Sequence, residues 1–342
     1  MCCISDIHIG VHQNSSQWHN ITLEWARWLA AELKSKNIQD IIISGDFFHY
    51  RDEIAVNTLH FVTEVLDLWS SFNIILLVGN HDAYYKDRSD VNSLTILNGQ
   101  DNVTVLSSLA TTQLFGKTIT FCPWGTTPDQ IPTSDLIFGH FEIKNFKQNS
   151  SRICDTGINA ADLLSKAGLI ISGHFHLRDE RVYKDGNILY LGNPFQMDFG
   201  DCDGTKGYYI LDFETLKYEF TENDMSPKHK KIYLSELVKS KRITSDIKRD
   251  FENNFIKFII DKDISADEVD IILKKFLTLN PVSINVDYAV NFNNYRVDET
   301  ARHDFSGIDV STAIEEFINL IEIDNKDEVT DYTVNLYKKC IQ

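Results

Sequence analysis

The chain has 342 residues, of which 43% are hydrophobic and 24% charged, values typical of a globular protein with one or two domains. Its longest apolar runs are far shorter than the roughly 20 residues that cross a bilayer, and the N-terminus lacks the features of a secretory signal, so we expect a soluble protein without a membrane segment. The net charge of -17 argues against strong polyanion binding by the chain as a whole, and six cysteines without CxxC spacing favour a reducing, cytoplasmic location.

Five short apolar runs each end at a residue that can bind a metal ion. Continuous aliphatic runs of this kind predict strands buried on both faces, and helical spacing at 18–36 and 55–71 separates the first three. This alternation predicts an α/β fold with ligands at the carboxyl ends of its strands. A glycine before the ligand in four motifs allows a close backbone approach. The runs are 2–5, 41–44, 74–78, 136–138 and 169–172, and they precede Asp6, Gly45-Asp46, Gly79-Asn80-His81-Asp82, Gly139-His140 and Gly173-His174-Phe175-His176.

After residue 172 the pattern changes to hairpins. Residues 181–183 and 188–191 flank a D-G-N turn, and 207–212 with 217–220 indicate a second pair of strands. We expect this segment to complete a second sheet. The first domain then ends in the polar stretch at 222–227.

A small α+β unit is predicted next. Residues 254–260 and 282–290 have strand character, and the capping box Ser265-Ala266-Asp267-Glu268 begins a helix that continues to 279. Residues 291–307 are polar, and two amphipathic helices are expected after them. The predicted division is a core domain at 1–226, a capping domain at 227–292, a linker at 293–308 and C-terminal helices at 309–342.

Basic residues gather at the start of the capping domain. Between Lys228 and Arg249 eight basic residues accompany two acidic ones, a local charge of +6. Such a stretch is either a solvated surface or a strip that contacts a phosphate backbone. The candidate DNA contacts are Lys228, Lys230, Lys231, Lys239, Lys241 and Arg242.

The two terminal helices each carry an apolar face. A helical hairpin after a polar segment cannot bury such a face unaided, so we expect it to pack on the capping domain or to dock on a partner. The candidate partner contacts are Phe317, Ile321 and Leu336.

The donors after the five strands are carboxylates, imidazoles and an amide, with no thiolate. This mixture suits Mn²⁺, Fe²⁺ or Zn²⁺ better than Ca²⁺ or Cu⁺. The set is large enough for two cations with a bridging carboxylate, the arrangement of a bimetallic phosphoesterase.

The series D-x-H, G-D-x-x-H, G-N-H-D, G-H and G-H-x-H, in this order over residues 6–176, resembles the calcineurin-like metallophosphoesterase superfamily. Within it the chain is most similar to the double-strand-break repair nucleases of the SbcD type, in particular the recombination endonuclease subunits of tailed bacteriophages. The narrower resemblance depends on G-D-F-F-H at 45–49, on Tyr190-Leu191-Gly192-Asn193-Pro194 and on Glu315-Glu316-Phe317-Ile318-Asn319. It implies a four-layer αββα sandwich with a small α+β capping domain and C-terminal helices.

The resemblance also implies roles for individual residues. His81 stabilises charge in the transition state or protonates the leaving oxygen, His49 orients His81 or contacts the phosphate, and Asp82 supports the site from outside the ligand set. The implied cofactor is a pair of divalent ions, Mn²⁺ by preference and Mg²⁺, Fe²⁺ or Zn²⁺ as alternatives. One ion is held by Asp6, His8, Asp46 and His176, and the other by Asp46, Asn80, His140 and His174, with Asp46 as the bridge.

The implied function is a DNA nuclease subunit with 3′-to-5′ exonuclease and single-strand endonuclease activity, acting in end processing, recombination and double-strand-break repair. Its implied partners are DNA, an SbcC-type coiled-coil ABC ATPase gripped by the terminal helices, and a second nuclease subunit in a heterotetramer; a phage-encoded subunit works in the host cytoplasm. Two alternatives stay open. One is a phosphomonoesterase or cyclic-nucleotide phosphodiesterase on the same core, and the other is a non-catalytic scaffold.

Overall fold

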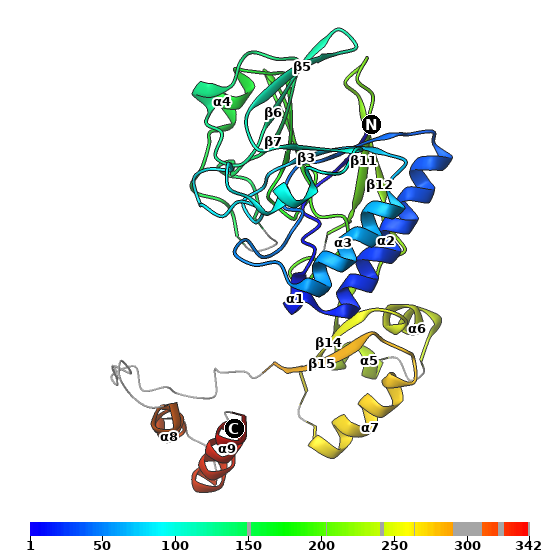
Figure 1. The fold of residues 1–342 in the computed structure, drawn as a ribbon. Coiled ribbons are helices and arrows are strands. Elements are labelled where there is room, and N and C mark those ends of the chain that lie inside the picture. The colour runs from blue at the N-terminus through cyan, green and yellow to red at the C-terminus, as the bar shows by residue number, and fades with distance from the viewer. Residues whose placement is uncertain are drawn as a thin grey trace.

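Two six-stranded sheets packed face to face form the larger part of the structure (Figure 1). The computed structural model describes residues 1–148, 152–202, 204–239, 243–262, 264–289, 310–320 and 325–340. The first sheet has the strand order β12-β11-β1-β2-β3-β4 and the second β5-β6-β7-β8-β10-β9. The strands of the first are β1 (Cys2–Ile4), β2 (Asp40–Ile43), β3 (Asn73–Leu77), β4 (Val103–Leu106), β11 (Gly207–Leu211) and β12 (Tyr218–Glu222). Those of the second are β5 (Ala110–Leu114), β6 (Lys117–Cys122), β7 (Leu136–His140), β8 (Leu169–Gly173), β9 (Asp179–Tyr183) and β10 (Gly186–Tyr190).

Alternate residues of the central strands face different layers, because successive side chains of a strand point to opposite faces of a sheet. In β2, Ile42 lies between the sheets, whereas Ile41 and Ile43 belong to the apolar cluster under the helices α2 (Ser16–Ser35) and α3 (Val56–Leu68). The outer face of the second sheet is covered by a third cluster that includes α4 (Ala160–Leu164). Short elements complete the core: α1 (Val11–Asn14), η1 (Ser93–Leu97) and η2 (Pro128–Gln130). The expected four-layer α/β fold is confirmed.

The hairpins after residue 172 are divided between the two sheets. Strands β9 and β10 extend the second sheet beside β8, as expected. Strand β11 instead pairs with β1 in the first sheet, with Cys2 opposite Ile210, and β12 pairs with β11. The expectation that the whole segment completes one second sheet is therefore wrong, because an antiparallel hairpin carries no sequence signal for the sheet edge that it joins.

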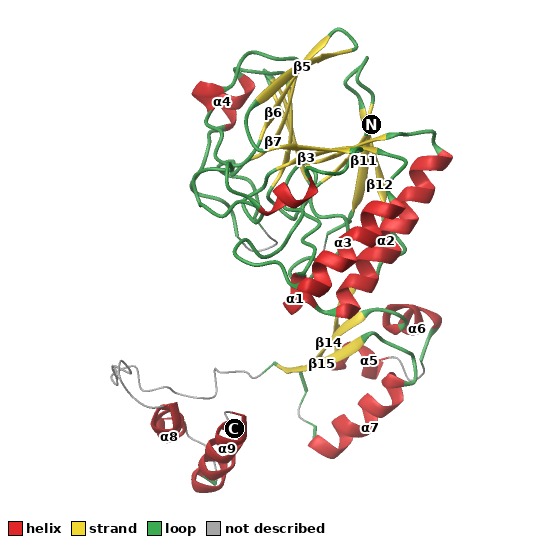
Figure 2. Cartoon of the chain, viewed as in Figure 1, coloured by secondary structure: helices red, strands yellow, loops and turns green. Residues whose placement is uncertain are grey.

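A three-stranded parallel sheet with its own apolar cluster follows the core (Figure 2). The capping box of Ser265 and Glu268 is present at the start of α7, and Thr244 caps α6 through its side chain. Strand β13 and the helices α5 and α6 lie in the stretch that the sequence marks only as basic. The elements are β13 (His229–Tyr233), α5 (Leu234–Lys239), α6 (Ser245–Phe251), β14 (Phe255–Ile260), α7 (Ala266–Leu277) and β15 (Ser283–Tyr288).

Aromatic rings connect this sheet to the core. Trp18 of α2 stacks on Phe255 of β14 with a centroid distance of 5.2 Å, and His229 stacks on Phe255 at 4.6 Å. The main-chain N–H of His229 donates to Oε1 of Gln196, a core residue, at 2.6 Å. The placement of a domain boundary at residue 226 stays a prediction.

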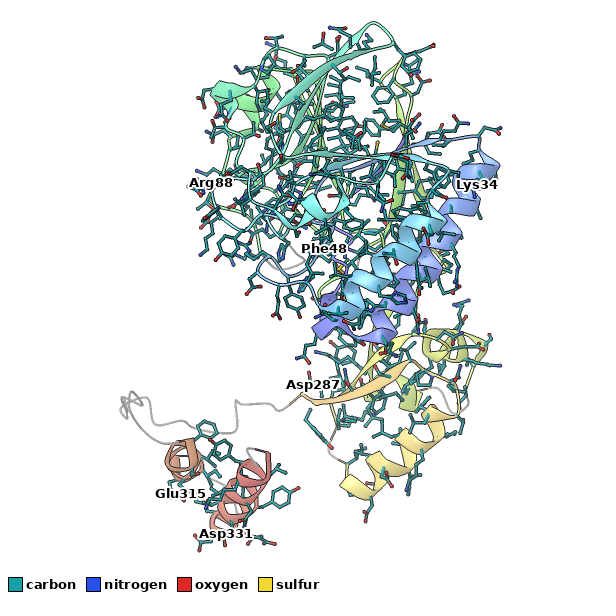
Figure 3. All side chains as sticks on the ribbon, in the orientation of Figure 1. Lys34, Phe48, Arg88, Asp287, Glu315 and Asp331 are labelled. Carbon is teal, nitrogen blue, oxygen red and sulfur yellow. The ribbon has the colours of Figure 1, made fainter. Side chains whose placement is uncertain are left out.

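The helices α8 (Val310–Leu320) and α9 (Lys326–Cys340) pack against each other, with Ile318 and Val334 buried. Figure 3 shows side chains such as Glu315 and Asp331 on these helices. Two apolar side chains are largely exposed, Phe317 at 58% and Leu336 at 49%. The predicted linker at 293–308 and the candidate contact Ile321 lie outside the described residues. Among the residues that are described, no helix has the length and apolar character needed to span a bilayer.

Candidate metal centre

The predicted donor residues converge at one edge of the two sheets. Strands β1, β2 and β3 run parallel in the first sheet, and β7 and β8 run parallel in the second, so their carboxyl ends meet. The donors are Asp6 and His8 after β1, Asp46 after β2, Asn80 after β3, His140 at the end of β7, and His174 and His176 after β8.

Four of these donors have a left-handed backbone. The φ angles of Asp6, His8, Asp46 and His174 are 54°, 51°, 54° and 93°. Non-glycine residues avoid this region unless the surrounding structure holds them there, and such strain concentrates at functional sites. Hydrogen bonds between the first two loops supply part of that hold, since Asp6 N–H donates to the carbonyl of Gly45 and His8 N–H to that of Asp46, both at 3.0 Å.

The glycine that precedes Asp46 is required by the close approach of a ligand ring. Gly45 has a φ of +99°, and a Cβ placed on it would lie 2.3 Å from Nδ1 of His140. A Cβ on Gly79 would lie 2.2 Å from Oδ1 of Asp46. At both positions a side chain would displace a donor, as the motif spacing predicts.

One cluster of ligand atoms is formed by Asp6, His8 and His176, whose donor atoms all lie within 4.8 Å of one another. The Nε2 atoms of His8 and His176 are 2.9 Å apart. The carboxylate of Asp46 approaches the same group, with Oδ2 3.7 Å from Nε2 of His8. Asp6 accepts the main-chain N–H of His174 at 3.1 Å, which ties the first motif to the last.

A second cluster contains Asp46, His140 and His174, again with ligand atoms within 4.8 Å of one another. Oδ1 of Asp46 lies 3.4 Å from Nε2 of His140. Oδ1 of Asn80 lies 2.9 Å from Nε2 of His140 and 2.7 Å from Nδ1 of His174. The two carboxylate oxygens of Asp46 therefore face different clusters, the geometry that a bridging ligand requires.

The hydrogen bond that orients the ring of His140 is further evidence that the donor set fits divalent cations. Nδ1 of the buried His140 lies 2.6 Å from the carbonyl oxygen of Ser44, which only accepts, so this nitrogen carries the proton. The other ring nitrogen, Nε2, faces Asp46 and Asn80, and it is the atom that would bind a cation once it has given up its proton. A metal-binding imidazole is commonly fixed by a carbonyl in this way.

Burial and mutual charge shift the ionisation of these groups. Burial lowers the pKa of His8 well below its usual value, and burial together with His140 lowers the pKa of His174 to about 3. Burial opposes ionisation of Asp46, but His140 and His8 outweigh it and lower the pKa of the carboxyl. The imidazole of His140 is buried too, yet Asp46 raises its pKa to about 9. A negative Asp46 among mostly neutral imidazoles is the charge state in which these side chains bind a cation.

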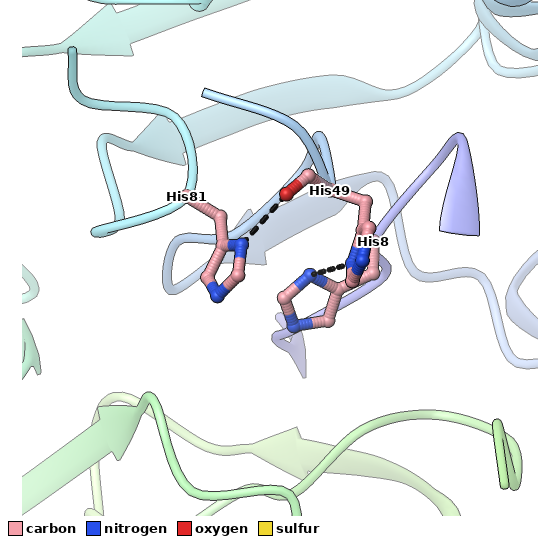
Figure 4. Close-up of side chains that lie close together, drawn as sticks. All are labelled: His8, His49 and His81. Carbon is pink, nitrogen blue, oxygen red and sulfur yellow. Dashed lines mark hydrogen bonds between the residues drawn. The ribbon is translucent and has the colours of Figure 1, made fainter. Parts of the chain in front are cut away.

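His81 and His49 lie beside His8, a member of the first cluster (Figure 4). Nδ1 of His81 donates to the main-chain carbonyl of His49 at 2.6 Å, and the N–H of His81 donates to Oδ1 of Asp46 at 2.8 Å. The ring of His49 approaches His8 instead, with their Nδ1 atoms 3.3 Å apart. His49 therefore orients His81 through its backbone, whereas its side chain contacts a candidate ligand.

The carboxylate of Asp82 links the loop that carries Asp46 to the loop that carries Asn80. Its Oδ1 accepts Phe48 N–H at 2.9 Å, and its Oδ2 accepts Gly79 N–H at 2.9 Å and Phe47 N–H at 3.3 Å. Burial and the nearby Asp46 raise the pKa of Asp82 to about 7, and these three donors limit the rise because they favour the carboxylate.

Two contributors to the site carry no motif that the sequence reveals. The ring of Trp124 lies 5.2 Å from that of His174 and 6.0 Å from that of His140, so it shields the second cluster on one side. Lys206 donates to the carbonyl of His176 at 2.8 Å. The only available signal for Trp124 is its place in a C-P-W-G turn directly after a strand of the second sheet.

A cavity of about 330 Å³ opens beside the last motif, lined by Gln148, His174, Phe175, His176, Asp198, Gly200 and Asp201. The candidate DNA contacts do not line it. Lys228 is paired with Glu222 and Asp224, and Lys230 lies 3.6 Å from Asp250, whereas Lys231 is exposed. Lys239 ends α5, and Lys241 and Arg242 lie outside the described residues.

Three comparisons with known proteins bear on the family of the chain. The family model for calcineurin-like phosphoesterases matches residues 2–178. The chain is 28% identical over 356 aligned positions to Exonuclease subunit 1 of Enterobacteria phage T4, and the match covers 99% of this chain and 98% of that protein. A solved archaeal phosphodiesterase is 14% identical and covers 65% of this chain and 98% of its own, with a TM-score of 0.37 that is too low to support an inference.

The matched segment spans more than half of the chain and includes all the donors from Asp6 to His176. The resemblance predicted from the five motifs is thereby confirmed at the level of the family. The chain belongs to the calcineurin-like phosphoesterase family.

Proposed function

We propose that the chain is the nuclease subunit of an ATPase–nuclease complex and hydrolyses phosphodiester bonds of DNA with two divalent cations, by preference Mn²⁺. The observation that carries the proposal is the pair of donor clusters that share Asp46, with His81 hydrogen-bonded to the same carboxylate. The near full-length similarity to a phage protein named as an exonuclease subunit supports DNA as the substrate. The proposed setting, which follows from the resemblance of the sequence motifs, is recombination and repair of DNA ends in a host cytoplasm.

The proposed ligand assignment follows the two clusters. If bound in this way, the cations would supply Lewis-acid stabilisation of the charge on a phosphate and would lower the pKa of a water molecule. Asp46 aligns the two sites because its two oxygens face different clusters. One cation is held by Asp6, His8, Asp46 and His176, and the other by Asp46, Asn80, His140 and His174.

His81 is the proposed general acid or charge stabiliser. Its Nδ1 is committed to the carbonyl of His49, so the proton on that nitrogen is fixed and Nε2 is left to act on the substrate. An imidazole can give a proton to the leaving oxygen near neutral pH, a contribution of typically 10² to 10⁴ in rate.

The acidic chain is proposed to gain its affinity for DNA from the cations and from an SbcC-type coiled-coil ABC ATPase. The exposed side chains of Phe317 on α8 and Leu336 on α9 are the proposed contacts with that ATPase. Two nuclease subunits are proposed to pair through the core domain, and the basic stretch from Lys228 is the proposed auxiliary DNA contact of a capping domain. Salt-dependent DNA binding that is equally tight without the ATPase would contradict this division.

The test compares substrates and one variant on the metal-loaded protein. We expect Mn²⁺ to support cleavage of labelled single- and double-stranded DNA, and His81→Ala to lower kcat about 10²- to 10⁴-fold while two Mn²⁺ ions stay bound. His60→Ala is the matched control, because the His60 side chain is 77% exposed on α3. Hydrolysis of p-nitrophenyl phosphate or a cyclic nucleotide with DNA left intact would favour the phosphomonoesterase or cyclic-nucleotide alternative. An assembly function that His81→Ala leaves unchanged would favour the scaffold. Nuclease activity that survives His81→Ala with both ions bound would contradict the proposed role of His81.

A further inference from the structure

Lys206, the residue before β11, places a charged amine in the protein interior. The residue is 5% exposed. Its Nζ donates to the main-chain carbonyl of His176 at 2.8 Å, to Oδ1 of Asp201 at 2.7 Å and to Oδ1 of Asn193. An ammonium group has three protons, so each of them has an acceptor.

The acceptors of Lys206 are themselves connected into a frame. Oδ2 of Asp201 accepts Nδ2 of Asn193 at 2.9 Å and the main-chain N–H of Met197 at 3.0 Å. The N–H of Asn193 donates to the carbonyl of His176 at 3.3 Å. Two donors from this frame therefore converge on a single backbone oxygen, that of His176.

The Tyr190-Leu191-Gly192-Asn193-Pro194 segment brings the frame to His176. Gly192 has a φ of +70°, and a Cβ on it would lie 2.8 Å from the carbonyl oxygen of His176 and 2.9 Å from the N–H of Arg178. Only a glycine allows the two segments to lie so close together. No residue of this segment takes part in the proposed chemistry. Its contact with the carbonyl of His176 gives it a structural role, that of supporting a candidate ligand.

His176 needs such a support because the sheet does not hold it. Strand β8 ends at Gly173, whose partner is His140 of β7, so His176 lies three residues beyond the last ladder pair. A buried ion pair is seldom the most stabilising solution, since apolar residues of the same volume are often equally good or better. The hydrogen bonds of Lys206 nevertheless point at the backbone of a residue whose Nε2 lies 2.9 Å from Nε2 of His8.

We propose that Lys206 is a positioning residue for the metal centre. Asp201 and Asn193 hold its amine, which donates directly to the carbonyl of His176 and thereby fixes the ring of His176 for the cation of the Asp6–His8–His176 cluster. Lys206 contacts neither substrate nor cation itself. The inference rests on the proposed metal assignment and adds to it a residue that no motif contains.

The experiment measures Mn²⁺ binding to the metal-free full-length chain by calorimetry and by electron paramagnetic resonance. We expect Lys206→Met to weaken one of two binding sites about 10- to 100-fold, the usual effect of removing a residue that orients a ligand. The other site keeps its affinity. The exchange-coupled signal of an ion pair is then lost at ion concentrations that saturate the wild type, whereas the signal of a single bound ion persists.

A double variant separates positioning from folding, because Lys206→Met alone leaves Asp201 as an unpaired buried charge. Asp201→Asn with Lys206→Met removes both charges at similar volume, and the carbonyl of His176 still loses its side-chain donor and keeps only the main-chain N–H of Asn193. We expect the double variant to fold and to show the same selective loss. Lys36→Met is the control. Lys36 also contacts a carboxylate, that of Glu32, and donates to a phenol, that of Tyr208, but it lies at the end of α2 and contacts none of the proposed ligands.

Each result decides the inference. Wild-type affinity at both sites in the folded double variant would overturn it and leave the metal assignment intact. Equal weakening of both sites, or the same loss in Lys36→Met, would also overturn it, because the effect would then be general. A wild-type chain that binds fewer than two ions would overturn the metal assignment itself, and this inference with it.

Discussion

Asp82 offers a sharp test of how the site is built, since it is completely buried and makes no predicted contact with a cation or with substrate. Its carboxylate accepts three main-chain N–H groups, those of Phe47 and Phe48 in the Asp46 loop and that of Gly79 in the Asn80 loop. The perturbation is Asp82→Ala, with Asp82→Asn as a milder form. Both leave the ligands themselves unchanged.

The magnitude follows from the number of donors left without an acceptor. A buried N–H that loses its partner costs about 1–3 kcal/mol, so at about 2 kcal/mol each the three donors released by Asp82→Ala amount to about 6 kcal/mol of unfolding free energy. In Asp82→Asn one oxygen is kept. It can occupy the Oδ2 position and keep two of the bonds, which leaves the Phe48 donor unsatisfied at a cost of about 2 kcal/mol.

The assay is urea unfolding of the metal-free protein followed by circular dichroism, with Mn²⁺ titrations on the same samples. We expect the wild type to be the most stable, the Asn variant to be less stable and the Ala variant to be the least stable. We also expect the Ala variant to bind both ions more weakly, because Asp46 and Asn80 lie on the released loops. Asp52→Ala, at an exposed position just after the same loop, is the control. An Ala variant as stable as the control would refute the bracing role of Asp82.

Three further predictions address other parts of the molecule. Mn²⁺ at a hundredfold excess over Kd should add about 2.7 kcal/mol per site to the unfolding free energy, and Asn80→Ala should reduce that gain, as measured by thermal unfolding with and without chelator. Burial lowers the pKa of His229 in the folded protein to about 4, whereas the pKa of an unfolded histidine is near 6.5. Between these pH values the unfolded chain binds one more proton, so the unfolding free energy should fall by up to about 3 kcal/mol as the pH drops from 6.5 to 4. The substitution His229→Phe should remove this part of the pH dependence. Ser265→Ala should cost about 1 kcal/mol, seen as lower helicity and earlier unfolding of the second unit, because Ser265 Oγ accepts the N–H of Glu268.

The sequence was sufficient to predict the donor set because each ligand lies at the end of a strand or within four residues after it. A run such as 74–78 identifies a buried strand, and parallel strands bring their carboxyl ends together, so Asn80 and Asp46 had to meet. The structure places these residues where that reasoning requires. Their roles as ligands remain predictions, as does the division of the chain into domains.

Contacts between segments without a periodic pattern could not be predicted. Lys206 is one basic residue among 33 Lys and Arg, and only the folded chain shows that its amine reaches the backbone of His176, 30 residues away. The pairing of β11 with β1 was missed for a related reason, since it joins the two ends of the core domain. His49 was expected to orient His81 or to contact the phosphate, and the sequence does not reveal that its backbone carbonyl is the group that contacts the ring of His81.

The central claim is that two divalent cations share Asp46. Anomalous scattering measured at the Mn absorption edge, on crystals soaked with Mn²⁺, locates each ion and its ligands in one experiment. The account predicts two peaks on either side of the Asp46 carboxylate, one beside His8 and His176 and the other beside His140 and His174. A single peak, or two peaks that do not contact Asp46, would contradict it.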